Sequence, residues 1–293
     1  MMTLLNPELV LHASPRRRAL RQLLRNPAGV TGLILLLLIV IMALGADVFY
    51  PGDPLDMVTT PLLWPGAESQ WLLGSDAMGR DLAAGIFHGS RVSLTIGLSA
   101  ALVSLVVGVV VGGLSGWYGG AIDSALLRLT TLFQTMPAFL LVVIAVAITT
   151  PSVTLIALAI GFTSWPTVAR LVRAEFRVLR EAEFILAART QGFSSLRIMV
   201  QEMLPATLPS LIVTASVMVA NAILMESALA FLGLGDPNQI SWGSMIGSGR
   251  EMLRTDWYLT AVPGLALVLA VLSLNLLGDA LNDALNPRLR QHP

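Results

Sequence analysis

Apolar runs long enough to cross a lipid bilayer constrain this chain more than any other feature. Hydropathy predicts membrane spans at residues 28–46, 92–114, 125–149, 152–172, 206–229 and 259–280. A helix needs about 20 predominantly apolar residues to cross the hydrocarbon core of a bilayer, and these runs are close to that length. With 55% hydrophobic and 12% charged residues, the chain also lies far from the composition of soluble proteins. The predicted fold class is therefore an all-α integral membrane protein with six transmembrane helices.

The distribution of arginine predicts which side of the membrane each loop occupies. All 18 basic residues are arginine. With the N-terminus inside, 14 of them lie on the cytoplasmic side, and those outside are Arg80, Arg91, Arg250 and Arg254. Both termini are therefore predicted to be cytoplasmic. A signal peptide is the competing interpretation of the first apolar run, but that run and the polar segment before it are too long, which favours an uncleaved anchor.

Missing residue types exclude several classes of chemistry. The chain has no cysteine, which excludes disulfides, thiolate metal sites and cysteine nucleophiles. It has no lysine either, which excludes a Walker A loop and Schiff-base chemistry. No catalytic, cofactor or metal site is predicted, and ATP and Mg²⁺ would have to be bound by partner chains. The net charge of zero gives no indication of a nucleic-acid partner.

Residues 183–205, EFILAARTQGFSSLRIMVQEMLP, form the longest polar interruption between the apolar runs. The pattern predicts two short helices joined at Gly192, which can close the first helix in the left-handed conformation. Ser194 or Ser195 can cap the second helix, and Pro205 is expected to mark the start of the next segment. An amphipathic helix–turn–helix is suited to docking in a groove of a soluble partner, whereas an ordinary cytoplasmic loop is the alternative.

The same stretch resembles the EAA loop of bacterial ABC importer permeases, through Ala187-Ala188, then Gly192, then Leu204-Pro205. Leu186 stands where the glutamate of that motif would be, as in the version found in dipeptide, oligopeptide and nickel permeases. The resemblance implies a loop that docks into a cleft of the ATPase subunit. Its candidate coupling residues are Glu183, Phe184, Ala187, Ala188, Arg189, Gly192, Phe193, Ser194, Leu204 and Pro205.

A second motif lies in the predicted external region between the first two spans. The segment 71–94, WLLGSDAMGRDLAAGIFHGSRVSL, resembles the signature of the C-type permease subunits of peptide and nickel importers, although Ala84-Gly85 replaces the usual Ser-Arg pair. Asp76, Arg80 and Asp81 can pair across a glycine turn and brace a loop, with substrate contact as the alternative. The residues of this external structural motif are Asp76, Gly79, Arg80, Asp81 and Arg91.

Glu226 is an acidic residue at membrane depth, where a charge is costly and is a functional candidate by default. It is interpreted either as a pore or outer-gate residue or as the partner of Arg250 or Arg254.

Two periodic patterns carry open alternatives. Glycines spaced four residues apart allow close approach of a helix, from another subunit or from this one: Gly108, Gly112 and Gly116. Arginines spaced three and four residues apart line one helix face and can anchor lipid headgroups or contribute to an ATPase interface: Arg170, Arg173, Arg177 and Arg180.

Further similarity at residues 231–243 and 275–287 extends the resemblance over about 71–290. It implies a type I ABC importer permease fold with a small external region between helices 1 and 2. The expected segments are a cytoplasmic N-terminal segment (1–27), the first span with its external loop (28–91), the permease domain (92–280, containing the coupling loop 183–205) and a cytoplasmic tail (281–293).

The resemblance also implies a function and an assembly. The chain would be a permease subunit in the bacterial inner membrane, forming half of a translocation pore for peptides or related small solutes. The implied partners are a second, B-type permease, two ABC ATPase subunits, an external substrate-binding protein and membrane lipid. Nickel or other metal chelates and glutathione-like compounds are alternative substrates. A secondary transporter and an intramembrane hydrolase are rival classes, which would need buried charges, broken helices or a nucleophile at depth.

Overall fold

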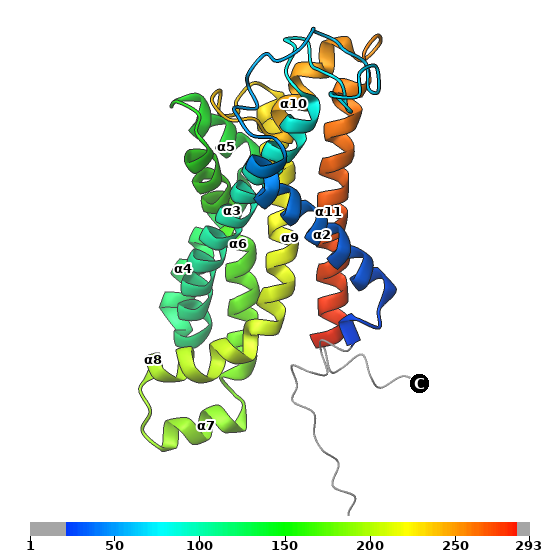
Figure 1. The fold of residues 1–293 in the computed structure, drawn as a ribbon. Helices are drawn as coiled ribbons and strands as arrows, with labels where there is room; N and C mark the ends of the chain where they lie inside the picture. Colours follow the sequence, from blue (N-terminus) through cyan, green and yellow to red (C-terminus); the bar gives the residue numbers. More distant parts are fainter. Residues whose placement is uncertain (1–21, 286–293) are drawn as a thin grey trace, which may run out of the picture.

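The computed structural model describes residues 22–285, which form a bundle of long helices with short helices at both ends (Figure 1). The short helices α7 and α8 protrude at one end, called here the α7 end, and α10 lies with an irregular cap at the opposite, α10 end. The helices are α2 (Pro27–Phe49), α3 (Leu82–Tyr118), α4 (Gly120–Thr135), α5 (Ala138–Ala147), α6 (Val153–Leu179), α7 (Glu183–Thr190), α8 (Ser195–Ile198), a π-helical segment (Met199–Met203), α9 (Leu204–Phe231), α10 (Trp242–Gly249), a 3₁₀ turn (Arg250–Met252) and α11 (Tyr258–Leu285).

The helices long and apolar enough to cross a membrane confirm the predicted all-α membrane fold. Five of them are single spans: α2, α3, α6, the continuous helix Ser195–Phe231 and α11. The pair α4 and α5 supplies a sixth crossing when it is counted as one span. Several helices extend past the predicted limits, because polar and glycine-rich turns at their ends lower the hydropathy without ending the helix. The 37 residues of α3, for example, measure about 55 Å, well beyond the roughly 30 Å hydrocarbon core.

The third span differs from the prediction of one continuous helix over residues 125–149. The chain bends by 76° between α4 and α5. Pro137 causes this break, because proline lacks an N–H and pushes the residue before it out of the helical region. Met136 accordingly has extended dihedral angles, φ −94° and ψ 134°.

The glycine stripe of α3 packs inside this chain, against α6, which decides between the two alternatives left by the sequence. A Cβ atom on Gly108 would lie 2.4 Å from the Cβ of Val168, and one on Gly116 would lie 2.6 Å from the Cβ of Phe176. Gly112 lies equally close to the backbone of α6. Larger residues at these positions would force the two helices apart, so the stripe fixes the α3–α6 distance.

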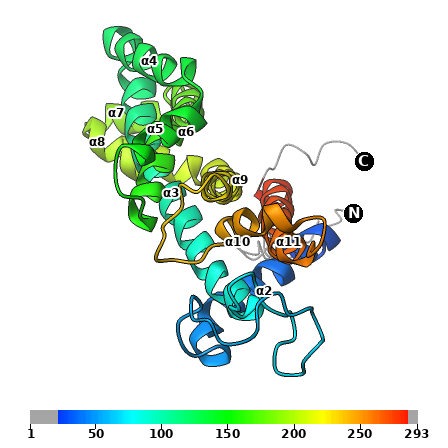
Figure 2. The ribbon, with the colours of Figure 1, turned by 90° about the horizontal axis from the view of Figure 1, so that it is seen from above.

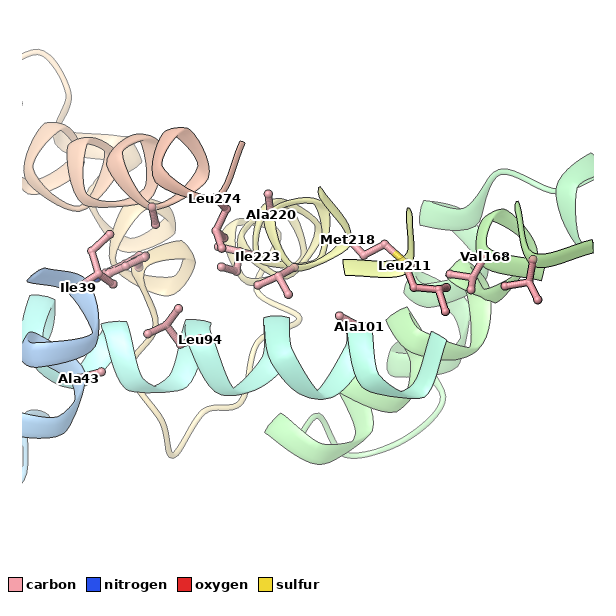
Figure 3. Close-up of a cluster of buried hydrophobic side chains, with 14 of the residues drawn as sticks. Ile39, Ala43, Leu94, Ala101, Val168, Leu211, Met218, Ala220, Ile223 and Leu274 are labelled. Carbon is pink, nitrogen blue, oxygen red and sulfur yellow. The ribbon is translucent and has the colours of Figure 1, made fainter. Parts of the chain in front are cut away.

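Helix α9 occupies the middle of the molecule, as the view along the bundle shows (Figure 2). Helices α4, α5 and α6 lie on one side of it, α2, α10 and α11 lie on the other, and α3 crosses between the two groups. The buried side chains between α3 and α9 belong to a core that reaches α6 on one side and α2 and α11 on the other (Figure 3), and a second cluster packs α5 against α3, α6 and α9. This core includes Leu94 and Ala101 of α3 with Leu211, Met218 and Ile223 of α9.

The expected N-terminal segment 1–27 and C-terminal tail 281–293 fall largely outside the described residues. The boundaries drawn at residues 91 and 280 lie inside α3 and α11, so those divisions stay predictions about organisation rather than breaks in the helices.

Candidate functional site

The loop at the α7 end has the predicted helix–glycine–helix conformation. Helix α7 ends with Gly192 at φ +80°, in the left-handed region. The N–H of Gly192 donates to the carbonyl of Arg189 at 3.0 Å, and the N–H of Phe193 donates to the carbonyl of Ala188 at 3.2 Å. These two bonds form a Schellman motif, which satisfies carbonyls that the end of a helix leaves free. The prediction of positive φ at Gly192 is confirmed.

The second helix begins as predicted and runs on into the span that follows it. The Ser194 side chain accepts a hydrogen bond from the N–H of Arg197 at 3.4 Å and caps α8. Pro205 lies in the first turn of α9, as expected, but α8 also continues through the π-helical segment into α9 without a break. The N–H of Leu204 donates to the carbonyl of Met199, five residues back, which carries the helix past the proline. The second half of the predicted coupling loop and the fifth span therefore share one continuous helix, Ser195–Phe231.

Helix α7 is apolar on two faces. Ile185 and Ala188 are buried against the bundle. Phe184 and Leu186 point away from it and are 48% and 44% exposed. Leu196 of α8 is 68% exposed. The remaining candidate coupling residues divide between the exposed Glu183, Ala187 and Arg189 and the partly buried Phe193 and Leu204. An apolar surface of this kind on a protruding element is characteristic of an interaction site.

Trp117, at the end of α3, fastens α7 to the bundle and was not found from the sequence. The Arg189 guanidinium lies over the Trp117 ring, 4.4 Å from its centroid. The Arg180 side chain donates to the Trp117 carbonyl at 3.3 Å. The indole itself is buried. A tryptophan at the end of a span suggests an interfacial anchor, so only the fold could show that it contacts the loop.

The arginine stripe of α6 does not act as a single unit. Arg173 forms two hydrogen bonds with the Asp123 carboxylate of α4, one of them 2.7 Å long, and Ser115 of α3 donates to the same carboxylate. This largely buried cluster joins α3, α4 and α6. Arg180 pairs with Glu181. Anchoring to lipid headgroups is therefore not the role of Arg173, and Asp123 is a partner that sequence spacing did not identify.

The predicted external motif forms a turn in the cap, but not through ion pairs. The Asp76 carboxylate accepts the N–H groups of Met78 and Arg80, at 2.8 and 2.9 Å. The Asp81 carboxylate caps α3 by accepting the N–H of Ala83 at 2.9 Å. Burial raises the pKa of the Asp81 carboxyl, and the N–H bonds at the start of the helix oppose that shift. The Nε of Arg80 is buried and has no hydrogen-bond partner within residues 22–285. The expected pairing of Arg80 with these carboxylates is therefore wrong.

One close contact fixes the cap internally, and one side chain of α11 ties it to the bundle. Gly79 has φ +81°, and a Cβ there would lie 2.3 Å from the carbonyl oxygen of Thr59, so only glycine fits. The Tyr258 hydroxyl at the start of α11 lies 3.1 Å from the carbonyl oxygens of both Leu63 and Ser75. These contacts support the structural interpretation of the motif.

Arg91 lies apart from the rest of the external motif. Its guanidinium makes a two-pronged ion pair with Asp47 of α2, at 2.9 and 3.2 Å, and its Nε donates to the Ala43 carbonyl at 3.0 Å. It therefore joins α3 to α2 rather than bracing the cap.

Glu226 is enclosed by this chain, with 2% of its surface exposed. Its carboxyl lies 3.4 Å from the Ser227 hydroxyl and beside Ser241, which caps α10. Arg250 instead donates to the Phe231 carbonyl at 3.0 Å, and Glu226 has no ion pair within the described part of the chain. The alternative that pairs Glu226 with an arginine is therefore wrong. A role as pore or outer-gate residue stays a prediction.

These features define a class of protein: a multi-pass helical membrane protein with a protruding helix–turn–helix at one end and a folded cap at the other. The family model described as "Binding-protein-dependent transport system inner membrane component" matches residues 108–291. The model described as "N-terminal TM domain of oligopeptide transport permease C" matches residues 14–65. The chain belongs to the family of binding-protein-dependent transport system inner membrane components.

Curated relatives resemble the chain over nearly its whole length. It is 38% identical over 291 residues to the "Di/tripeptide transport system permease protein DppC" of Pseudomonas aeruginosa (strain UCBPP-PA14), covering 97% of this chain and 96% of that protein. It is 34% identical over 273 residues to the "Dipeptide transport system permease protein DppC" of Haemophilus influenzae (strain ATCC 51907 / DSM 11121 / KW20 / Rd), covering 91% and 92%.

A solved structure supports the fold. A chain of the MetNI methionine ABC transporter, in an inward-facing conformation, matches with a TM-score of 0.58 and 18% identity. The match covers 69% of this chain and 96% of that one. The chain is thus a multi-pass inner-membrane permease subunit of a binding-protein-dependent ABC importer with the type I fold.

Proposed function

We propose that the chain is the permease subunit of an importer of short peptides. The names of its relatives support this substrate class, because two of them, at 38% and 34% identity over nearly full length, are permeases for dipeptides or di- and tripeptides. Each permease of this kind would form half of a pore together with a second, B-type permease. An external substrate-binding protein would deliver the peptide to the cap at the α10 end.

The observation that carries the coupling mechanism is the continuous helix from α8 to the end of α9. Helix α7 and the exposed Phe184, Leu186 and Leu196 would dock into a cleft of an ABC ATPase subunit, as hydrophobic anchors of a helix in a groove. Movement of the ATPase pair would then move the continuous helix Ser195–Phe231, called here the rod, whose 37 residues reach the opposite end of the bundle. This chain would hydrolyse nothing itself, and ATP and Mg²⁺ would be bound by the two ATPase chains.

The orientation follows from this assignment. The α7 end faces the cytoplasm, as do both termini, and the cap at the α10 end faces outward. The excess of arginine near the α7 end supports this orientation, because positive charge is retained on the cytoplasmic side. Through the contact of α7 and α8 with the ATPase, the conformation of the ATPase pair would shift the equilibrium between pore conformations, and the pore would shift that of the ATPases equally.

The test is co-expression with the neighbouring transport genes, purification and reconstitution into proteoliposomes. The expected result is that ATPases co-purify with the chain, and that labelled di- or tripeptide is taken up only with ATP and loaded binding protein. Uptake that runs without ATP, driven by an ion gradient, would instead establish a secondary transporter and overturn the proposal. Uptake of metal chelates but not of peptides would overturn the substrate class alone.

A further inference from the structure

A groove opens on the side of the bundle between the bent α4–α5 pair, α6 and α9. Its volume is about 890 Å³, within the range of about 300–1,000 Å³ that is usual for small-molecule sites. The groove runs past Pro137, so the 76° bend of the third span helps to form it. It is therefore a consequence of the broken helix that hydropathy alone did not reveal.

The walls of this groove carry polar side chains that have no partner among the described residues. Six of them make no side-chain hydrogen bond or ion pair to any residue of 22–285: Gln134, Ser164, Thr167, Arg170, Thr214 and Asn221. Polar groups at membrane depth are costly, and they normally face a bundle interior or a water-filled cavity where they can find partners. Their gathering on one groove indicates that something polar completes it.

Among the described residues, Arg170 is the one charged side chain that lines the groove. It lies 17 residues along α6 from the start of the helix, about 25 Å from the outer end. Arg173, one turn further along, is already neutralised by Asp123, whereas Arg170 has no carboxylate beside it among the described residues. Arg170 is also exposed, so its guanidinium is free to meet a ligand.

We propose that this groove is a subsite for the transported peptide, in which Arg170 binds a carboxylate group of the substrate. The inference rests on the proposed transport of peptides. A guanidinium presents paired N–H donors that match a carboxylate, and the amide and hydroxyl groups of Gln134, Thr167 and Asn221 are suited to the peptide bond. Because these six polar side chains have no partner among the described residues, a peptide could bind them without breaking a contact within residues 22–285.

Two other sources could supply the same anionic chemistry: a lipid phosphate and a carboxylate of the partner permease. The three sources differ in what they predict for Arg170→Gln. A substrate contact predicts a loss that depends on the peptide. A lipid contact predicts a loss that depends on the bilayer, and a subunit contact predicts less assembled complex.

The experiment measures uptake into proteoliposomes by the complete complex with its binding protein, using Ala-Ala and its C-terminal amide as substrates. The variants are Arg170→Gln, Arg170→Lys and, as a matched control, Arg177→Gln, an exposed arginine of the same helix outside the groove. For each peptide, the rate of a variant is divided by the wild-type rate, which cancels the selectivity of the binding protein. The vesicles contain either phosphatidylcholine alone or phosphatidylcholine with phosphatidylglycerol.

The expected result is that Arg170→Gln lowers the relative uptake of the free acid about 3- to 10-fold more than that of the amide, in both lipids. Arg170→Lys retains part of the preference, and Arg177→Gln shows none. An equal loss for both peptides, a loss seen only with phosphatidylglycerol, or a fall in assembled complex would each overturn the inference.

A second measurement tests the charge without the amide substrate. Because the chain has no cysteine, Arg170→Cys offers one site in this subunit for an aminoethyl or a sulfonatoethyl thiol reagent, and the equally treated wild-type complex controls for modification of the partner chains. The positive adduct is expected to restore uptake of Ala-Ala and the negative adduct to leave it low, whereas equal uptake with both would overturn the inference. If the wild-type complex transports peptides in these assays, failure of the subsite leaves the proposed function standing. If it transports none, the proposed function fails first.

Discussion

Gly192→Val perturbs the coupling loop through its backbone alone. Gly192 has φ +80°, and no atom lies within 4 Å of the position that a Cβ would occupy. The substitution therefore causes no steric clash with the rest of the protein. The cost comes from the left-handed backbone conformation, which is about 1–3 kcal/mol less favourable for residues other than glycine. β-Branched residues such as valine lie at the upper end of this range. Asn visits this region more readily and is expected to be the mildest replacement.

The free-energy cost of this conformation is expected to lower the affinity of the ATPase for the permease. A free energy of 1–3 kcal/mol corresponds to a change of about 5- to 150-fold in an equilibrium. The apparent affinity of the ATPase falls in proportion to the fraction of permease whose loop is ready to dock, so Gly192→Val is expected to weaken ATPase binding by up to this factor. The spans keep their hydrophobicity, so the amount of protein in the membrane is expected to stay normal.

Gly233 supplies a matched control at the other end of the same rod. It closes α9 with φ +82°, it has no atom within 4 Å of its Cβ position, and the same Schellman bonds surround it. The assay is the dissociation constant of the ATPase from the purified permease pair, together with ATPase stimulation by loaded binding protein. Gly192→Val is expected to weaken binding, Gly192→Asn to weaken it least, and Gly233→Val to leave it unchanged. Wild-type affinity in Gly192→Val, or an equal loss in Gly233→Val, would refute the argument.

Three further predictions test the surroundings of the loop. Trp117→Leu keeps an apolar side chain but removes the ring under the Arg189 guanidinium, so the contact that holds α7 to the bundle weakens by about 0.5–1 kcal/mol. The expected result is a lower ATPase activity in the presence of loaded binding protein, which Trp117→Phe partly restores. Asp123→Asn leaves the Arg173 guanidinium without its counter-charge, so the free energy of unfolding is expected to fall by about 1–3 kcal/mol. The measurement is the unfolding midpoint in detergent, and an unchanged midpoint would contradict a structural role for this ion pair. Single cysteines at the exposed positions Ser69 and Gln191 should react with an impermeant thiol reagent from opposite sides, Ser69 from outside, and the reverse pattern would contradict the orientation.

Features fixed by local chemistry could be read from the sequence. The turn at Gly192 and the cap at Ser194 involve groups a few residues apart, so residue type and spacing were enough. The spans were equally accessible, because length and hydrophobicity are local properties as well. The bend at Pro137 could have been found too, since proline inside a span is a known cause of kinks.

Contacts between distant segments could not be read in the same way. The periodicity of the α6 arginines places them on one face, but nothing in it shows that Arg173 meets Asp123 while Arg170 meets no described residue. Trp117 and Arg189 come together only because the glycine stripe brings α3 and α6 into close contact. Pro205 lies at the start of α9 as expected, but the sequence did not show that a π-helical segment joins α8 to α9 without a break.

That π-helical segment matters for how force can pass through the subunit. The rod Ser195–Phe231 carries the coupling loop at one end, and at the other Gly243 of α10 packs so tightly on Ser227 that a Cβ at Gly243 would lie 2.5 Å from the Ser227 Cα. A close-packed contact between helices transmits displacement because it has no free volume in which to absorb it. The buried Met199 and Met203 of the π-helical segment hold the rod to the rest of the bundle just where it leaves the loop. If α7 and α8 move together as the proposed coupling requires, we expect the rod either to turn as a whole about this segment, which would displace α10, or to break the packing there.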